Sequence, residues 1–114
     1  MNKTQIELLN GEMVDVELKY NPIKCMKIAR DFPQANDAFT LAVGEKTAEV
    51  NISNLYNAVY VGYRQANMND YLSFEEFSEE FDFDMKEAMK IYYAMIDKNS
   101  RNQYLEELAR LGKK

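Results

Sequence analysis

The dipeptide Asn10-Gly11 lies between two stretches of alternating polar and apolar residues, and it constrains the fold of the N-terminus more than any other feature. An Asn-Gly pair flanked in this way is the strongest short-range signal for a β-hairpin. The sequence therefore predicts two antiparallel strands within residues 4–20. Because an isolated hairpin is marginally stable in water, its apolar face must pack on helices, or the hairpin must pair with another chain's strand.

The length of the hairpin loop decides which side chains share a face. A two-residue loop would place Ile6 opposite Asp15 and would divide the apolar residues between the two faces. A three-residue loop with Gly11 in the left-handed conformation instead places Ile6 opposite Val14. We expect this longer loop, because it gathers the apolar residues on one buried face: Ile6, Leu8, Val14, Val16 and Leu18.

The remainder of the chain, residues 21–112, reads as helical. Asn21 is a good N-cap and is followed by a proline, so a helix should begin there and close before Pro33. A short helix over 37–43 is expected next, and a longer amphipathic helix over about 51–67 follows it. The apolar stripe of the longer helix consists of Ile52, Leu55, Tyr56, Val59, Tyr63 and Ala66, and Gly62 would allow a close neighbour.

Two capping boxes help to divide the C-terminal half into helices. Ser73 and Glu76 predict a short helix through about Phe81, and Ser100 with Gln103 predicts a last helix that ends at Gly112. Between them, residues 85–98 form a helix whose expected inward stripe is Met85, Ala88, Met89, Tyr92, Met95 and Ile96. The inward residues of the last helix would be Tyr104, Leu105, Leu108 and Leu111. The predicted class is α+β and mostly α-helical: one domain, residues 1–114, with a hairpin and four to five helices in a small bundle.

Composition excludes several kinds of chemistry. The chain has no histidine, so histidine-based triads, histidine general bases and histidine-ligated zinc are excluded within it. Its one cysteine, Cys25, cannot form an internal disulfide, and we read it as a small buried hydrophobic residue in a reducing compartment. A net charge of −5 argues against nucleic-acid binding. No membrane span or signal peptide is recognisable, so we expect a cytoplasmic protein.

The acidic charge is concentrated between residues 70 and 87, where eight acidic residues and one basic residue give a net −7. Asp82-Phe83-Asp84 imitates the start of an EF-hand loop, but its sixth and twelfth positions hold Glu87 and Tyr93 in place of glycine and glutamate. We therefore predict no metal site. The segment is either a solvated face or a surface for a basic partner.

Aromatic residues are interleaved with these acids. Phe74, Phe77 and Phe81 share one side of a helix, and they either pack in the core or leave a docking surface for a partner helix. Eight tyrosines and seven methionines are typical of adaptable protein-binding surfaces. No phosphate-binding loop or nucleophile elbow is present, so we predict neither catalytic residues nor a cofactor.

Three segments carry a family resemblance. They are the block at residues 55–67 (LYNAVYVGYRQAN), residues 72–77 (LSFEEF) and Phe83-Asp84. Together with the hairpin and the Asn-Pro helix start, this order resembles the tail assembly chaperones of long-tailed, siphovirus-like phages and prophages of Gram-positive bacteria. The resemblance covers about residues 5–97.

The resemblance implies a non-enzymatic chaperone in the cytoplasm of the host bacterium that is absent from the mature virion. Such proteins bind the tape measure protein, keep it soluble and help to recruit tail tube subunits, and many are also made in a longer, frameshifted form. We predict that the docking surface comprises Tyr60, Tyr63, Arg64, Phe74, Phe77, Phe81 and Phe83. Self-association through the free hairpin edge is also expected. Two alternatives stay open: a small phage structural adaptor of the head-tail connector type, and a cytoplasmic regulatory module that binds another protein.

Overall fold

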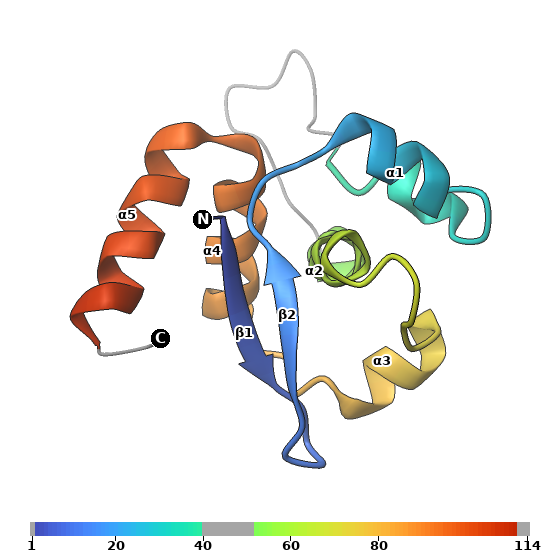
Figure 1. Ribbon diagram of the computed structural model, residues 1–114, viewed down its shortest axis with the longest axis horizontal. Coiled ribbons are helices and arrows are strands. Elements are labelled where there is room, and N and C mark those ends of the chain that lie inside the picture. The colour runs from blue at the N-terminus through green and yellow to red at the C-terminus, as the bar shows by residue number, and fades with distance from the viewer. Residues whose placement is uncertain (1, 40–51, 112–114) are drawn as a thin grey trace.

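The computed structural model describes residues 2–39 and 52–111 and confirms the predicted α+β, mostly helical class (Figure 1). Its described elements are β1 (Lys3–Glu7), β2 (Met13–Glu17), α1 (Pro22–Ile28), the 3-10 helix η1 (Pro33–Asn36), α2 (Ile52–Ala66), α3 (Phe74–Glu80), α4 (Met85–Ile96) and α5 (Lys98–Arg110). The hairpin, α1, α3 and α4 surround α2, which Figure 1 shows nearly end-on, and α5 lies outside α4. Among the described helices, none is long and apolar enough to cross a membrane.

The hairpin has the predicted register. Ile6 lies opposite Val14, and Gly11 has a φ of 87°, in the left-handed region that favours glycine. The Leu8 amide donates to the Glu12 carbonyl at 2.9 Å, which closes the three-residue loop. On the inner face four of the expected residues are buried and Val14 is half-buried.

Helix α2 is the centre of the fold, and its C-terminal half is more enclosed than an amphipathic stripe predicts. Every residue from 58 to 65 is buried, because β2 and α4 cover different sides of this helix. Gly62 permits the approach of β2 as expected: a Cβ there would lie 2.9 Å from Val16 Cγ1 and 3.1 Å from the Glu17 carbonyl oxygen. The N-terminal half of α2 is more open, and Ile52 is exposed where the stripe predicted it inward.

The start predicted for the last helix is wrong. The N-cap is Asp97, whose carboxylate accepts the Ser100 amide at 3.0 Å and the Ser100 hydroxyl at 2.7 Å. An aspartate is as good an N-cap as a serine, and its position at the end of α4 lets α5 begin almost at once, at Lys98. Leu111 is exposed rather than inward, and Gly112 lies outside the described residues.

The inward face of α4 is rotated from the predicted one. Ala88, Tyr92 and Met95 are buried as expected, but Met85, Met89 and Ile96 are exposed. Ile91 and Ala94 are buried in their place. The rotation follows from packing, since α4 contacts α2 on one side and α5 on another.

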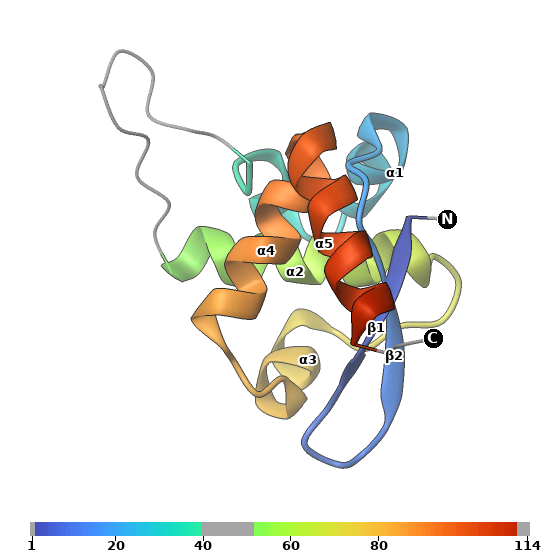
Figure 2. The same ribbon diagram turned by 90° about the vertical axis from the view of Figure 1, so that its left-hand side faces the viewer.

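The predicted extents of two helices need correction, and one of these helices lies partly outside the described residues. Helix α1 ends at Ile28, and residues 37–39 form a turn rather than the start of a helix, while 40–43 lie outside the described residues. The outer edge of β1, which pairs with no other described strand, has α5 alongside it in both views (Figures 1 and 2). A helix beside a strand edge is a common way to hinder edge-to-edge pairing.

Candidate partner-binding site

The seven residues predicted to bind a partner do come together, but most of them form the interior. Tyr60, Tyr63, Arg64, Phe77 and Phe81 are buried, with Phe77 0% exposed. Phe77 lies at the centre, and its ring centroid is 4.8 Å from Tyr63 and 5.4 Å from both Tyr60 and Phe81. Only Phe74 and Phe83 reach the surface in part. In this structure the core-packing alternative therefore describes five of the seven residues.

Arg64 holds α2 against the turn that follows α1. Its guanidinium is almost fully buried and donates two hydrogen bonds to the Asp31 carboxylate, at 2.9 and 3.0 Å, and a weaker one to the Tyr60 hydroxyl at 3.3 Å. The ring of Tyr71 covers the guanidinium at 3.4 Å. The hydrogen bonds from Arg64 hold the pKa of Asp31 below its usual range. The buried guanidinium therefore joins α2 to the turn that follows α1.

Tyr60 and Tyr63 bond to the backbone of one residue, Leu72, in the segment between α2 and α3. The Tyr60 hydroxyl donates to the Leu72 carbonyl, and the Tyr63 hydroxyl accepts from the Leu72 amide, both at 2.8 Å. Burial raises the pKa of both phenols. Leu72 precedes Ser73, which caps α3 in the predicted capping box, so these tyrosines position α3.

The Gln65 and Asn67 side-chain amides bond to the backbone of β2 and of the segment that follows it. Gln65 is buried, donates to the Lys19 carbonyl at 2.8 Å and accepts from the Asn21 amide at 3.0 Å. Asn67 donates to the Asp15 carbonyl at 3.0 Å. The run Arg64-Gln65-Ala66-Asn67 belongs to the segment that resembles the chaperone family. Three of its side chains therefore hydrogen-bond the N-terminal half of the fold to α2.

An open groove lies between η1, the first half of α2 and α3, and we call it the α2–α3 groove. It has a volume of about 580 Å³ and is lined by Gln34, Ile52, Ser53, Tyr56, Asn57, Phe74 and Ser78. Ile52 is half exposed, and the Tyr56 ring stacks on Phe83 at 4.5 Å. The Ser78 hydroxyl oxygen is buried and has no hydrogen-bond partner in the part of the chain that the structure describes. Sequence periodicity missed Ile52 and Ser78, because it assigned Ile52 to the core and gave no role to Ser78.

Helix α3 also carries two exposed carboxylates next in sequence to lining residues of this groove. Glu75 and Glu79 are exposed and follow the lining residues Phe74 and Ser78 by one position each. They belong to the −7 segment. Within the described ranges, no three His, Cys, Asp or Glu side chains are grouped so that they could hold a metal ion. The arrangement is suited to an apolar partner segment that carries basic residues at its flank.

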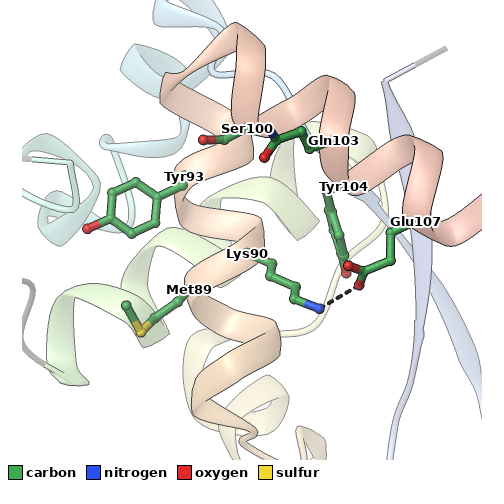
Figure 3. A pocket seen from close by; sticks show the side chains of 7 residues that line it. All are labelled: Met89, Lys90, Tyr93, Ser100, Gln103, Tyr104 and Glu107. Atoms are coloured by element: carbon green, nitrogen blue, oxygen red, sulfur yellow. Dashed lines mark hydrogen bonds and ion pairs between the residues drawn. The ribbon is translucent and has the colours of Figure 1, made fainter.

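A second, smaller depression lies between α4 and α5, and we call it the α4–α5 notch (Figure 3). Its volume is about 260 Å³. The lining residues are Met89, Lys90, Tyr93, Ser100, Gln103, Tyr104 and Glu107. Figure 3 shows the ion pair between Lys90 and Glu107, which spans the two helices.

No protein-family model, no curated protein and no solved structure matches the chain. The resemblance of about residues 5–97 to tail assembly chaperones therefore stays a prediction from the sequence.

Proposed function

We propose that this protein is a non-enzymatic tail assembly chaperone of a siphovirus-like phage or prophage of a Gram-positive bacterium. In the host cytoplasm it would bind the tape measure protein, keep it soluble and help to recruit tail tube subunits, and it would be absent from the mature virion. The observation that carries the proposal is the α2–α3 groove. Tyr56, Asn57 and Phe74, which line it, belong to the segments that resemble this family.

The groove offers apolar contact to an amphipathic helix. Ile52, Tyr56 and Phe74 are exposed or half-buried there, so a partner side chain placed between them would leave water. Full burial of one Leu or Phe side chain is worth about 1.5–3 kcal/mol. Two such side chains, one helical turn apart, would give a useful affinity for a protein that must hold and later release its partner.

The polar groups of the groove add orientation and selectivity. The Ser78 hydroxyl lacks a partner among residues 2–39 and 52–111 and can hydrogen-bond to a docked chain. Glu75 and Glu79 would attract basic residues that flank the apolar stripe of the partner. The proposed ligand is therefore a helix with an apolar face and a basic flank, a common composition in long helical proteins.

The test is co-expression with the product of the long helix-coding reading frame that should lie downstream of this gene. Wild-type protein should raise the soluble fraction of that product and co-purify with it. Ile52→Asp should abolish both effects, because it places a charge in the groove. Ile23→Asp is the matched control, because Ile23 also lies in the first turn of a helix and is 67% exposed, against 51% for Ile52. An aspartate in a first helical turn does not disfavour the helix.

Three results would contradict the proposal. Equal loss of solubilisation in both variants would show that the groove is not the docking site. Detection of the protein in purified phage particles would favour a structural adaptor. Stoichiometric co-purification with one small protein, and no effect on the long product, would favour a regulatory module.

A further inference from the structure

Helix α1 presents a face to solvent that is both apolar and basic, and we call it the α1 outer face. Ile23 and Met26 are 67% and 71% exposed, and Lys27 and Arg30 are exposed as well. These four residues lie at spacings of three, one and three positions, so they share one side of α1 and of the turn that continues it. The opposite side of α1 is buried in the core. The α1 outer face is thus an apolar pair with a basic flank.

The charges of the chain are divided between two regions. Residues 19–30 contain four basic residues and no acidic residue, whereas residues 70–87 have a net charge of −7. Among the described residues, neither Lys27 nor Arg30 has an ion-pair partner, and the same holds for Glu75 and Glu79 on α3. Charged side chains of opposite sign that are unpaired within a molecule are able to pair across an interface. The α1 outer face and α3 are therefore complementary in charge.

The α2–α3 groove adds the apolar counterpart. Tyr56 and Phe74 give it apolar lining, and the buried Ser78 hydroxyl oxygen has no hydrogen-bond partner within residues 2–39 and 52–111. Phe74 and Ser78 are four residues apart and form one row of α3, and Glu75 and Glu79 form the next row. A short helix in the groove would meet apolar residues first and carboxylates at its flank. Helix α1 has seven residues, or about two turns, and carries its residues in that arrangement.

We infer that the α2–α3 groove binds the α1 outer face of a second copy of this chain. Ile23 and Met26 would enter the groove, and Lys27 and Arg30 would lie beside the carboxylates of α3. A molecule does not dock its own α1 in this way, because α1 and α3 lie on opposite sides of α2 (Figures 1 and 2). Since two different surfaces meet, a dimer keeps a free groove at one end and a free α1 outer face at the other, so association continues beyond the dimer.

Self-docking goes beyond the proposed function and gives the same groove a regulator. An interface made by one short helix is small, so the association should be weak and transient. A longer partner helix with more apolar residues would displace it. Free molecules would thereby cover the apolar surface of the groove until a partner is present. Self-docking does not depend on which protein that partner is.

Sedimentation velocity on the purified full chain, without any partner, tests self-docking. Wild-type protein should form species larger than a dimer as its concentration rises from micromolar to millimolar. Ile23→Asp and Ile52→Asp should each stay monomeric over this range, because each loses one of the two surfaces. An equimolar mixture of these two variants should form a heterodimer and nothing larger, since one keeps the groove and the other keeps the α1 outer face. Met85→Asp, at another exposed residue in the first turn of a helix, is the control and should associate like the wild type.

An exchange of charges tests the complementarity, and it decides the matter if circular dichroism shows that either aspartate variant is unfolded. The double variant Lys27→Glu/Arg30→Glu should self-associate at least about tenfold more weakly than the wild type, and so should Glu75→Lys/Glu79→Lys. Mixing the two double variants should restore association, because each acidic face then meets a basic groove and each basic face an acidic groove. Added salt should weaken the wild-type association.

Self-docking is ruled out if the wild type stays monomeric at millimolar concentration. It is also ruled out if folded variants fail to recover association when mixed, or if Ile23→Asp associates like the wild type. None of these results touches the proposed function, because Ile23→Asp keeps its groove and should still solubilise the long partner. Loss of solubilisation in Ile52→Asp alone, with no self-association of the wild type, would support the proposed function and overturn self-docking.

Discussion

The aromatic cluster between α2 and α3, which consists of Tyr60, Tyr63, Phe77 and Phe81, has a sequence pattern similar to that of the outer face of α4. The two regions have opposite environments. Both combine large apolar residues at helical spacing with charged neighbours. In the cluster even Arg64 and Gln65 are buried, whereas on α4 two methionines of the predicted core stripe face solvent. The difference arises from neighbours: α2 contacts β2, α1, η1, α3 and α4, while α4 contacts mainly α2 and α5. Spacing predicts a helix, and the number of packed neighbours decides how much of it is core.

The largest difference in stability between the two regions is expected at Phe77. Phe77→Ala removes a ring that is 0% exposed, so the free energy of unfolding should fall by about 3–5 kcal/mol. Met89→Ala on the outer face of α4 should cost less than about 1 kcal/mol. Urea denaturation followed by circular dichroism measures both values. Equal, small losses would mean that Phe77 is not a core residue and would restore it as a candidate for partner contact.

Local signals in the sequence were sufficient for several elements. The left-handed Gly11, the apolar alternation around it and the Ser73 capping box each act within a few residues, so their outcome does not depend on the rest of the fold. Gly62 was predicted to permit a close neighbour for the same reason, since a missing side chain is visible in the sequence. The identity of that neighbour, β2, was not.

Other features depend on tertiary contacts that no local pattern encodes. The rotation of α4 is set by α2 and α5 together, and sequence periodicity alone placed Met89 inward. The burial of Arg64 requires Asp31, which is 33 residues away in the chain. Both depressions are likewise formed between helices, so the sequence could name Phe74 as a candidate but could not show that Ile52 and Ser78 lie beside it.

A smaller effect is expected at the ion pair that distinguishes the cluster from an ordinary apolar core. Asp31→Asn leaves the buried Arg64 charge without its carboxylate and should lower the free energy of unfolding by about 1–2 kcal/mol, since Asp31 itself is half exposed. Asp37→Asn, at an exposed aspartate nearby, should change it by less than about 0.5 kcal/mol. Chemical denaturation at pH 7 measures both.

The Arg64–Asp31 ion pair also predicts how the stability of the protein depends on pH. Because the pKa of Asp31 is lower in the folded protein than in the unfolded chain, its stabilising effect is complete above the unfolded value of about 3.9. The effect is lost as the pH falls through the lower, folded value. NMR titration of the Asp31 carboxyl should show this depressed pKa, and Arg64→Met should move it upward. An unchanged titration in that variant would contradict the assignment of Arg64 as its cause.

The smallest expected effect concerns the hydrogen bonds that Tyr60 and Tyr63 make to the Leu72 backbone. Tyr63→Phe removes the oxygen that accepts the Leu72 amide, and should cost about 1 kcal/mol while the ring packing is kept. The Leu72 amide should then exchange its hydrogen about five- to tenfold faster, because its partner is gone. Tyr93→Phe on the outer face of α4 is the control and should change neither quantity. If Leu72 exchange is also unchanged in Tyr63→Phe, packing of the rings alone positions α3. The hydrogen bonds of the cluster would then not account for its difference from the outer face of α4.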